Sequence, residues 1–264
     1  MKLLNGSDLV GYIKERQARQ VRGLVGGGVY PKLAIIRTNP DPVVDSYMKL
    51  KQGYGQEIGV AVDVHTIGQD KALGLIDTLN LDKSVHGIIV QIPLPDPSRT
   101  NEILNTVASE KDVDGLSEGT KFDPATPLAI SWLLAGYNIE LKNKKIVIVG
   151  HGRLVGKPLA KIWRASNLDV TVADKNTPDL SKETLTADII VSATGQPGLI
   201  TKDMIKSDVV IVDAGVATDK NGLIGDVSPD VRELPDITIT PEKGGVGPLT
   251  VSALFENVIR SAKQ

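Results

Sequence analysis

The 264-residue sequence contains no cysteine and only three histidines. Without cysteine the chain forms no disulfide, offers no thiolate ligand to a metal and has no cysteine nucleophile. The histidines, His65, His86 and His151, lie far apart along the chain, which argues against a histidine-rich metal site. The sequence therefore predicts no bound metal.

Long apolar runs and a strong net charge are also missing. No segment approaches about 18 uninterrupted apolar residues, so we expect no transmembrane helix, and the N-terminal segment lacks the apolar core of a signal peptide. The formal net charge of −2 gives no electrostatic reason to expect nucleic acid or a membrane surface as a partner. A hydrophobic content of 41% and a charged content of 23% are ordinary for a globular protein, and we expect the protein in the cytoplasm.

Strand and helix patterns alternate along the chain. Short apolar runs predict strands at residues 32–37, 60–66, 86–92, 145–150, 168–173, 188–193 and 208–213. Helical patterns begin at Ser7 and cover residues 41–59, 72–79, 128–137 and 250–262. Strands separated by helices of this length predict parallel sheets.

A polar, proline-containing break at residues 111–128 separates two series of strands and helices. We therefore predict an α/β fold with two lobes. The N-terminal lobe is expected at residues 1–122 and a Rossmann-like second lobe at residues 123–248. The last helix, 249–264, is expected to return to the N-terminal lobe.

The second lobe opens with a strand that ends in glycine, KKIVIVGHGRLVGKP, residues 144–158. Gly150 permits a tight turn, Gly152 allows close approach of a ligand, and Gly156 follows one residue later than in G-x-G-x-x-G. Backbone N–H groups at such a turn can meet a pyrophosphate at the start of the following helix. The alternative is a turn whose glycines serve packing alone.

Asp174 stands at the end of the next predicted strand and bears on the choice of cofactor. A carboxylate there can accept hydrogen bonds from the ribose 2′-hydroxyl of NAD and repels the 2′-phosphate of NADP. It can equally be a solvated acid at a strand end, and the adjacent Lys175 could pair with an added phosphate.

In the N-terminal lobe, Tyr47 and Lys51 are four residues apart on a predicted helix and so share a face. A lysine in a partly dry cleft can have a lowered pKa and move protons near neutral pH, although this spacing is usually an ordinary helix face. Gln91 ends a buried strand, where an amide needs a partner. The carboxylates of the loop that carries Asp114 could equally serve only to form a turn.

Together these segments resemble a known family. YMKLK, GIIVQIPLP, KDVDG, the strand with GxGxxVGxP, and GGVGPLT occur in the order seen in bifunctional methylenetetrahydrofolate dehydrogenase/cyclohydrolase, the FolD-type proteins, and the resemblance runs from about residue 2 to 262. It implies a folate cleft between a catalytic lobe and an NAD(P)-binding lobe, and a homodimer through the latter. It also implies oxidation of 5,10-methylenetetrahydrofolate to the 5,10-methenyl form and hydrolysis of that form to 10-formyltetrahydrofolate.

The resemblance also implies residue roles. Lys51 would be the central catalytic group, Gln91 would position it, Tyr47 would lie against the folate ring, and Asp114 would hydrogen-bond the pterin. Backbone walls beside the folate would come from Gly245, Val246, Gly247 and Pro248. The expected cofactor-binding residues are Gly150, His151, Gly152, Arg153, Val155, Gly156, Asp174, Lys175 and Val216.

The departures from the family lie in the cofactor lobe. His151 and Gly152 replace the usual Arg-Ser pair, and Asp174 replaces a histidine. One hypothesis is therefore that NAD replaces NADP; another is that Lys175, Arg153 or His151 supplies replacement charge for NADP. Further alternatives are a protein that is mainly a cyclohydrolase, and a folate- or nucleotide-binding protein without turnover. A shikimate-type dehydrogenase, the remaining alternative, would not predict QIPLP or GGVGPLT.

Overall fold

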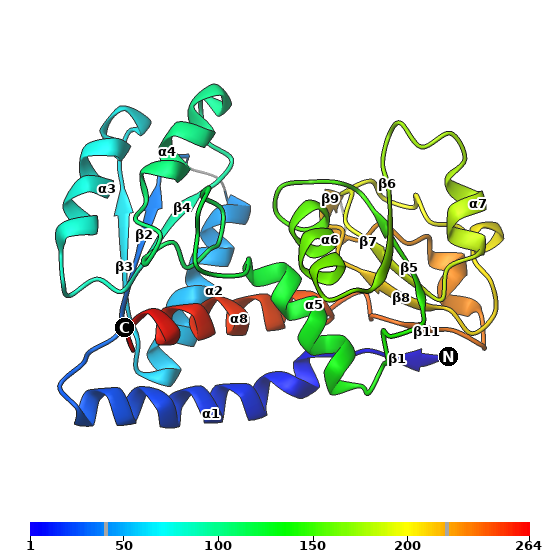
Figure 1. The fold of residues 1–264 in the computed structure, drawn as a ribbon, viewed down its shortest axis with the longest axis horizontal. Coiled ribbons are helices and arrows are strands. Elements are labelled where there is room, and N and C mark those ends of the chain that lie inside the picture. The colour runs from blue at the N-terminus through cyan, green and yellow to red at the C-terminus, as the bar shows by residue number, and fades with distance from the viewer. Residues whose placement is uncertain (40–41, 220–221) are drawn as a thin grey trace. The chain divides into compact units, whose positions relative to one another are not determined.

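The computed structural model describes residues 1–39, 42–219 and 222–264. These residues form two compact units (Figure 1). Unit 1 comprises Met1–Val10 with Thr126–Thr250, and unit 2 comprises Gly11–Ala125 with Val251–Gln264. The division falls inside the helices α1 (Gly6–Gly26) and α8 (Val246–Ser261), so each unit contains part of both.

Unit 2 is built on a three-stranded parallel sheet in the order β3-β2-β4. Its strands are β2 (Lys32–Arg37), β3 (Ala61–Thr66) and β4 (Gly87–Gln91). The helices of this unit are α2 (Pro42–Ile58), α3 (Ala72–Leu81) and α4 (Thr100–Thr106), with the short 3-10 turns η1 (Gln69–Lys71) and η2 (Pro97–Arg99). The predicted helix at 41–59 begins with Asp41, which lies outside the described residues.

Apolar side chains cover both faces of this sheet. Ile36 and Ile88 pack on one face with Ile76 from α3 and Ile103 from α4. Elsewhere in the unit α8 packs against α2, where the rings of Tyr54 and Phe255 stack with their centroids 5.2 Å apart. The last helix thus returns to the N-terminal lobe, as the sequence predicts.

Unit 1 contains a six-stranded sheet in the order β1-β11-β8-β7-β5-β6, with every pairing parallel. Its strands are β1 (Lys2–Leu3), β5 (Lys145–Val149), β6 (Asp169–Ala173), β7 (Ile189–Ser192), β8 (Val210–Asp213) and β11 (Thr238–Ile239). The remaining elements are α5 (Ala125–Gly136), α6 (Gly156–Ala165), α7 (Leu180–Leu185), η3 (Lys202–Met204), the hairpin β9 (Ala217–Asp219) and β10 (Gly222–Ile224), and η4 (Pro229–Glu233).

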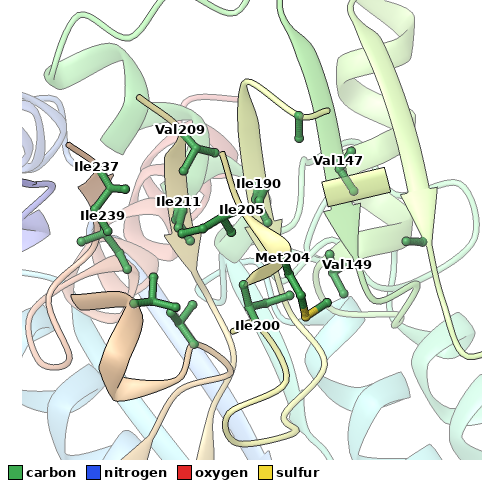
Figure 2. Packing of buried hydrophobic residues seen from close by; sticks show 14 residues of the cluster. Val147, Val149, Ile190, Ile200, Met204, Ile205, Val209, Ile211, Ile237 and Ile239 are labelled. Atoms are coloured by element: carbon green, nitrogen blue, oxygen red, sulfur yellow. The ribbon is translucent and has the colours of Figure 1, made fainter. Parts of the chain in front are cut away.

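The core of unit 1 follows from the register of its strands. Val147, Ile190, Ile211 and Ile239 are partners on neighbouring strands, and Figure 2 shows them in a row across the sheet. All four are fully buried, as expected for parallel strands covered on both faces. This buried row packs β5, β7, β8 and β11 together, and the glycine turn follows the carboxyl end of β5.

The N-terminal residues depart from the expected division at 1–122 and 123–248. Residues 1–10 belong to unit 1, because Lys2 and Leu3 add an edge strand to β11 through backbone hydrogen bonds. A two-residue strand has no side-chain pattern that a sequence could reveal. None of the described helices has the length and apolar character needed to cross a membrane.

Candidate active site

Lys51 and Gln91 meet in unit 2. Lys51 lies on α2 and donates a hydrogen bond from Nζ to Oε1 of Gln91 at 3.1 Å. Gln91 is the last residue of β4, and its amide donates to the carbonyl of Ile92 at 3.2 Å. That second bond turns the oxygen of the amide toward the lysine, so Gln91 fixes the direction of the Lys51 amine.

Asp114 lies in a tight loop after α4. The carboxylate of Asp112 closes this loop by accepting hydrogen bonds from the backbone N–H and the hydroxyl of Ser117, at 2.9 and 2.7 Å. Gly115 has a φ of +71°, and a Cβ there would lie 2.8 Å from the carbonyl oxygen of Phe122. Only glycine fits this position, so the carboxylate of Asp112 and the glycine of KDVDG shape the loop that presents Asp114.

Burial perturbs both titratable groups of this site. It lowers the pKa of Lys51, an effect that the negative charge of Asp114 opposes. Burial also raises the pKa of Asp114; the charge of Lys51 opposes that shift, and Asp112 adds to it. Both shifts favour the uncharged forms, which suits groups that exchange protons or hydrogen bonds with a ligand near neutral pH.

The other residues expected around the folate lie in different places. Tyr47 is one turn before Lys51 on α2 and is partly exposed. The segment Gly245–Pro248 spans the start of α8 and belongs to unit 1. There the preceding Gly244 accepts a hydrogen bond from the backbone N–H of Ser7 at 3.0 Å. The structure therefore brings Lys51, Gln91 and Asp114 together in one unit and places Gly245–Pro248 in the other.

The glycine turn of unit 1 has the form that a dinucleotide needs. Gly150 follows β5 with a φ of +103°. Gly156 begins α6, and a Cβ there would lie 1.8 Å from the carbonyl oxygen of Gly150. No atom of the described residues lies within 4 Å of a Cβ built at Gly152. Packing thus requires Gly150 and Gly156, whereas Gly152 leaves open space where a pyrophosphate can approach the backbone.

Asp174 stands beside this turn. The N–H of Gly150 donates to the carbonyl of Ala173 at 2.8 Å, so the turn and the end of β6 are adjacent. Oδ1 of Asp174 accepts the N–H of Asn176 at 2.8 Å, which fixes an exposed carboxylate at the strand end.

The other expected cofactor residues lie at the same edge of the sheet. His151, Arg153, Val155 and Lys175 follow β5 or β6, and Val216 follows β8. These residues fit a nicotinamide dinucleotide, because ligands of open parallel sheets bind at the carboxyl ends of the strands.

Two domains of one known family match the two halves of the chain. The catalytic domain of tetrahydrofolate dehydrogenase/cyclohydrolase matches residues 4–114, and the NAD(P)-binding domain of the same family matches residues 124–264. The chain belongs to the tetrahydrofolate dehydrogenase/cyclohydrolase family.

Members of this family resemble the chain over its full length. A bifunctional protein FolD from Lactobacillus acidophilus is 37% identical over 276 residues, covering 100% of this chain and 98% of the relative. The crystal structure of a bifunctional FolD enzyme from Campylobacter jejuni superposes with a TM-score of 0.94 at 38% identity, covering 100% of this chain and 99% of that one. A FolD structure from Trypanosoma brucei, complexed with NADP and an inhibitor, gives a TM-score of 0.92 at 28% identity and covers 99% of this chain and 97% of that one.

One residue that supports the loop of Asp114 cannot be recognised from the sequence. Asn257 of α8 is fully buried and donates from Nδ2 to the carbonyls of Val113 and Asp123, each at 2.9 Å. These carbonyls flank the loop of Asp114, so α8 holds that loop in place. Asn257 lies in an amphipathic helix pattern, where a polar residue is normally exposed, and only the fold shows that it is buried.

Proposed function

We propose that this protein oxidises 5,10-methylenetetrahydrofolate to 5,10-methenyltetrahydrofolate with a nicotinamide cofactor and hydrolyses the methenyl form to 10-formyltetrahydrofolate. The observation that carries this proposal is the partly buried Lys51, whose amine is held by Gln91 and interacts with the charge of Asp114. Family membership along the whole chain supports both activities.

Lys51 acts as the proton-transfer group for the hydrolysis. The methenyl substrate is a cation, and an ammonium group beside it would repel it. Burial lowers the pKa of Lys51, so the neutral amine is favoured and can accept a proton from the attacking water. Gln91 keeps the amine directed, because its Oε1 accepts a hydrogen bond from Nζ.

Asp114 binds the substrate rather than the water. A carboxyl group whose pKa is raised by burial can exchange hydrogen bonds with the N–H groups and ring nitrogens of a pterin. Tyr47 supplies a ring face to the bound substrate one helical turn from Lys51. For the oxidation, the nicotinamide cofactor supplies a hydride acceptor when bound, and the Gly150–Gly156 turn with Val216 holds it.

The cofactor is NAD in preference to NADP. Asp174 supports this choice, because its carboxylate is fixed at the end of β6 beside the glycine turn. There it suits a ribose 2′-hydroxyl and opposes a 2′-phosphate. The His151-Gly152 pair offers no guanidinium at the turn's second position, although Arg153 and Lys175 are near enough along the chain to test as alternatives.

The test follows methenyl-folate formation by absorbance with NAD or NADP. Wild-type protein is expected to show the higher kcat/KM with NAD. Asp174→Ala is expected to raise KM for NAD by about 10–100-fold, the value of a hydrogen bond to a charged group. Asp169→Ala, at the opposite end of β6, is the matched control and is expected to change neither cofactor's KM. A strong wild-type preference for NADP would refute the assignment of NAD.

Two broader proposals follow from family membership. The protein forms a homodimer through unit 1, which light scattering coupled to size-exclusion chromatography can test, and it acts in the cytoplasm. A monomer at micromolar concentration would contradict the first proposal.

A further inference from the structure

A buried carboxylate in unit 1 holds the start of the loop that follows β7. Asp226 is fully buried. Its Oδ2 accepts hydrogen bonds from the hydroxyl of Ser192, the last residue of β7, and from the backbone N–H of Thr194, both at 2.7 Å. The loop therefore leaves the strand in a direction that Asp226 determines.

The same segment also holds the end of this loop. The N–H of Ile200 donates to the carbonyl of Asp226 at 3.1 Å, and the N–H of Ser228 donates to the carbonyl of Ile200 at 2.8 Å. The stretch from Ala193 to Leu199 is thus tied at both ends to residues 226–228, by the Asp226 side chain at one end and by the backbone at the other.

A second buried carboxylate fixes Asp226 in turn. Asp213, at the end of β8, accepts the N–H groups of Gly215, Asp226 and Val227 at 3.1, 3.0 and 3.1 Å. A Cβ at Gly215 would lie 2.0 Å from Oδ1 of Asp226, and a Cβ at Gly225 would lie 2.1 Å from Oδ2 of Asp213. The Asp226 carboxylate therefore lies against Gly215, two residues after Asp213, and the Asp213 carboxylate lies against Gly225, the residue before Asp226. These contacts hold the loop after β8 together with the loop after β7.

These loops border the glycine turn. The N–H of Ala193 donates to the carbonyl of Val149 at 2.8 Å. A Cβ at Gly150 would lie 2.6 Å from the carbonyl oxygen of Ala193. A shift of the β7 loop would therefore change the space beside the first glycine of the turn, at the sheet edge where ligands of this fold class bind.

We propose that Asp226 is a positioning residue for the nicotinamide cofactor. It acts through the backbone of Ala193 and Thr194, which it sets against Gly150. This inference rests on the proposed function, since it assumes that the cofactor binds at the glycine turn. It predicts an effect on the affinity for the cofactor and none on the hydrolysis, because Lys51 and its partners belong to unit 2.

The hydrogen bonds of Asp226 allow the role of hydrogen-bond acceptance to be tested separately from the role of the negative charge. Oδ2 accepts both bonds, whereas Oδ1 has no hydrogen-bond partner among the described residues. An asparagine can place its oxygen at the Oδ2 position and its amide where no bond is lost. Asp226→Asn is therefore expected to keep the loop in place, and Asp226→Ala is expected to release it.

The experiment measures the Kd of NADH and NADPH by fluorescence titration of the full-length protein, together with the rate of methenyl-folate hydrolysis. Asp226→Ala is expected to weaken binding of the preferred nucleotide by about tenfold, because both hydrogen bonds that hold the loop are lost, with hydrolysis within about twofold of wild type. Asp226→Asn is expected to bind within about threefold of wild type. Gly215→Ala, whose Cβ would displace the Asp226 carboxylate, is expected to weaken binding like Asp226→Ala.

The matched control is Asp188→Ala. Asp188 precedes β7 at the opposite end of the strand and accepts bonds from Lys145 and Lys206. Its loss is expected to lower stability without changing the Kd. If Asp226→Ala fails to fold, Ser192→Ala removes a single donor and is expected to weaken binding about threefold.

The outcomes distinguish this inference from the proposed function. Equal nucleotide affinity in wild type, Asp226→Ala and Gly215→Ala would overturn the positioning role alone. A loss in Asp226→Asn as large as in Asp226→Ala would also overturn it, since charge would then matter instead of hydrogen-bond acceptance. A wild-type protein that neither binds a nucleotide nor hydrolyses methenyl-folate would contradict the proposed function itself.

Discussion

Replacing Lys51 by methionine tests the centre of the proposed mechanism. Methionine keeps an unbranched apolar stem but has no amine, so the variant loses the hydrogen bond to Gln91 and the group that accepts a proton from water. A positioned acid–base group contributes about 10²–10⁴-fold to a rate, which corresponds to about 3–5 kcal/mol of activation free energy. We therefore expect methenyl-folate hydrolysis to fall by that factor while the fold is retained.

The pH dependence of the hydrolysis tests which protonation state of Lys51 is active. The neutral amine is the active form, so the wild-type rate is expected to rise with pH as Lys51 loses its proton and then to level off. Because burial lowers the pKa of Lys51, this rise is expected below the ordinary lysine value of 10.5. Lys51→Arg keeps a positive charge across the whole range and is expected to stay inactive at every pH.

The assay follows the loss of methenyl-folate absorbance from pH 6 to 10, with the spontaneous rate subtracted and circular dichroism as the check on folding. Lys49→Met is the matched control, because Lys49 is an exposed lysine on the same helix and its loss is expected to leave the rate unchanged. Hydrolysis by Lys51→Met within about tenfold of wild type, well short of the loss of a general base, would refute the reasoning.

The remaining predictions concern packing around the two sites. Gly156→Ala is expected to lower the free energy of unfolding by about 1–3 kcal/mol, because its Cβ would collide with the Gly150 carbonyl. Gly152→Ala, which has open space, is expected to leave stability unchanged and weaken cofactor binding; denaturant titrations of both variants check this, and equal stabilities would contradict it. Asn257→Ala leaves two buried carbonyls unpaired beside the Asp114 loop. It is expected to cost about 1–3 kcal/mol for each and to raise KM for the folate but not for the cofactor, and steady-state kinetics with an unchanged folate KM would count against it.

The sequence predicts the α/β layout well where strands are buried on both faces. The runs at Lys32–Arg37, Gly87–Gln91 and Lys145–Val149 are apolar at every interior position, because helices cover both sides of these sheets. The helical pattern of the sequence begins at residue 250, whereas α8 begins at Val246. Proline is tolerated in a first helical turn, so Gly247 and Pro248 lie inside the helix.

The candidate site is predictable only as far as local spacing and family motifs reach. Four-residue spacing places Tyr47 and Lys51 on one helix face, but the contact of Lys51 with Gln91 joins residues 40 positions apart. The contacts of Asp226 span 32 and 34 positions. Such pairs depend on how the strands are ordered in the sheet, which no periodicity in the sequence encodes.

The path of the chain through α8 has a consequence for the order of events during synthesis. Residues 11–125 leave the ribosome early, yet the backbone carbonyls of Val113, Asp123 and His86 accept hydrogen bonds from Asn257 and Ser261, which are made last. The loop that carries Asp114 therefore stays unfastened until nearly all of unit 1 has been made. A nascent chain arrested before α8 would carry every residue of the Lys51 site but not the helix that holds it together, so folate-binding competence arrives last.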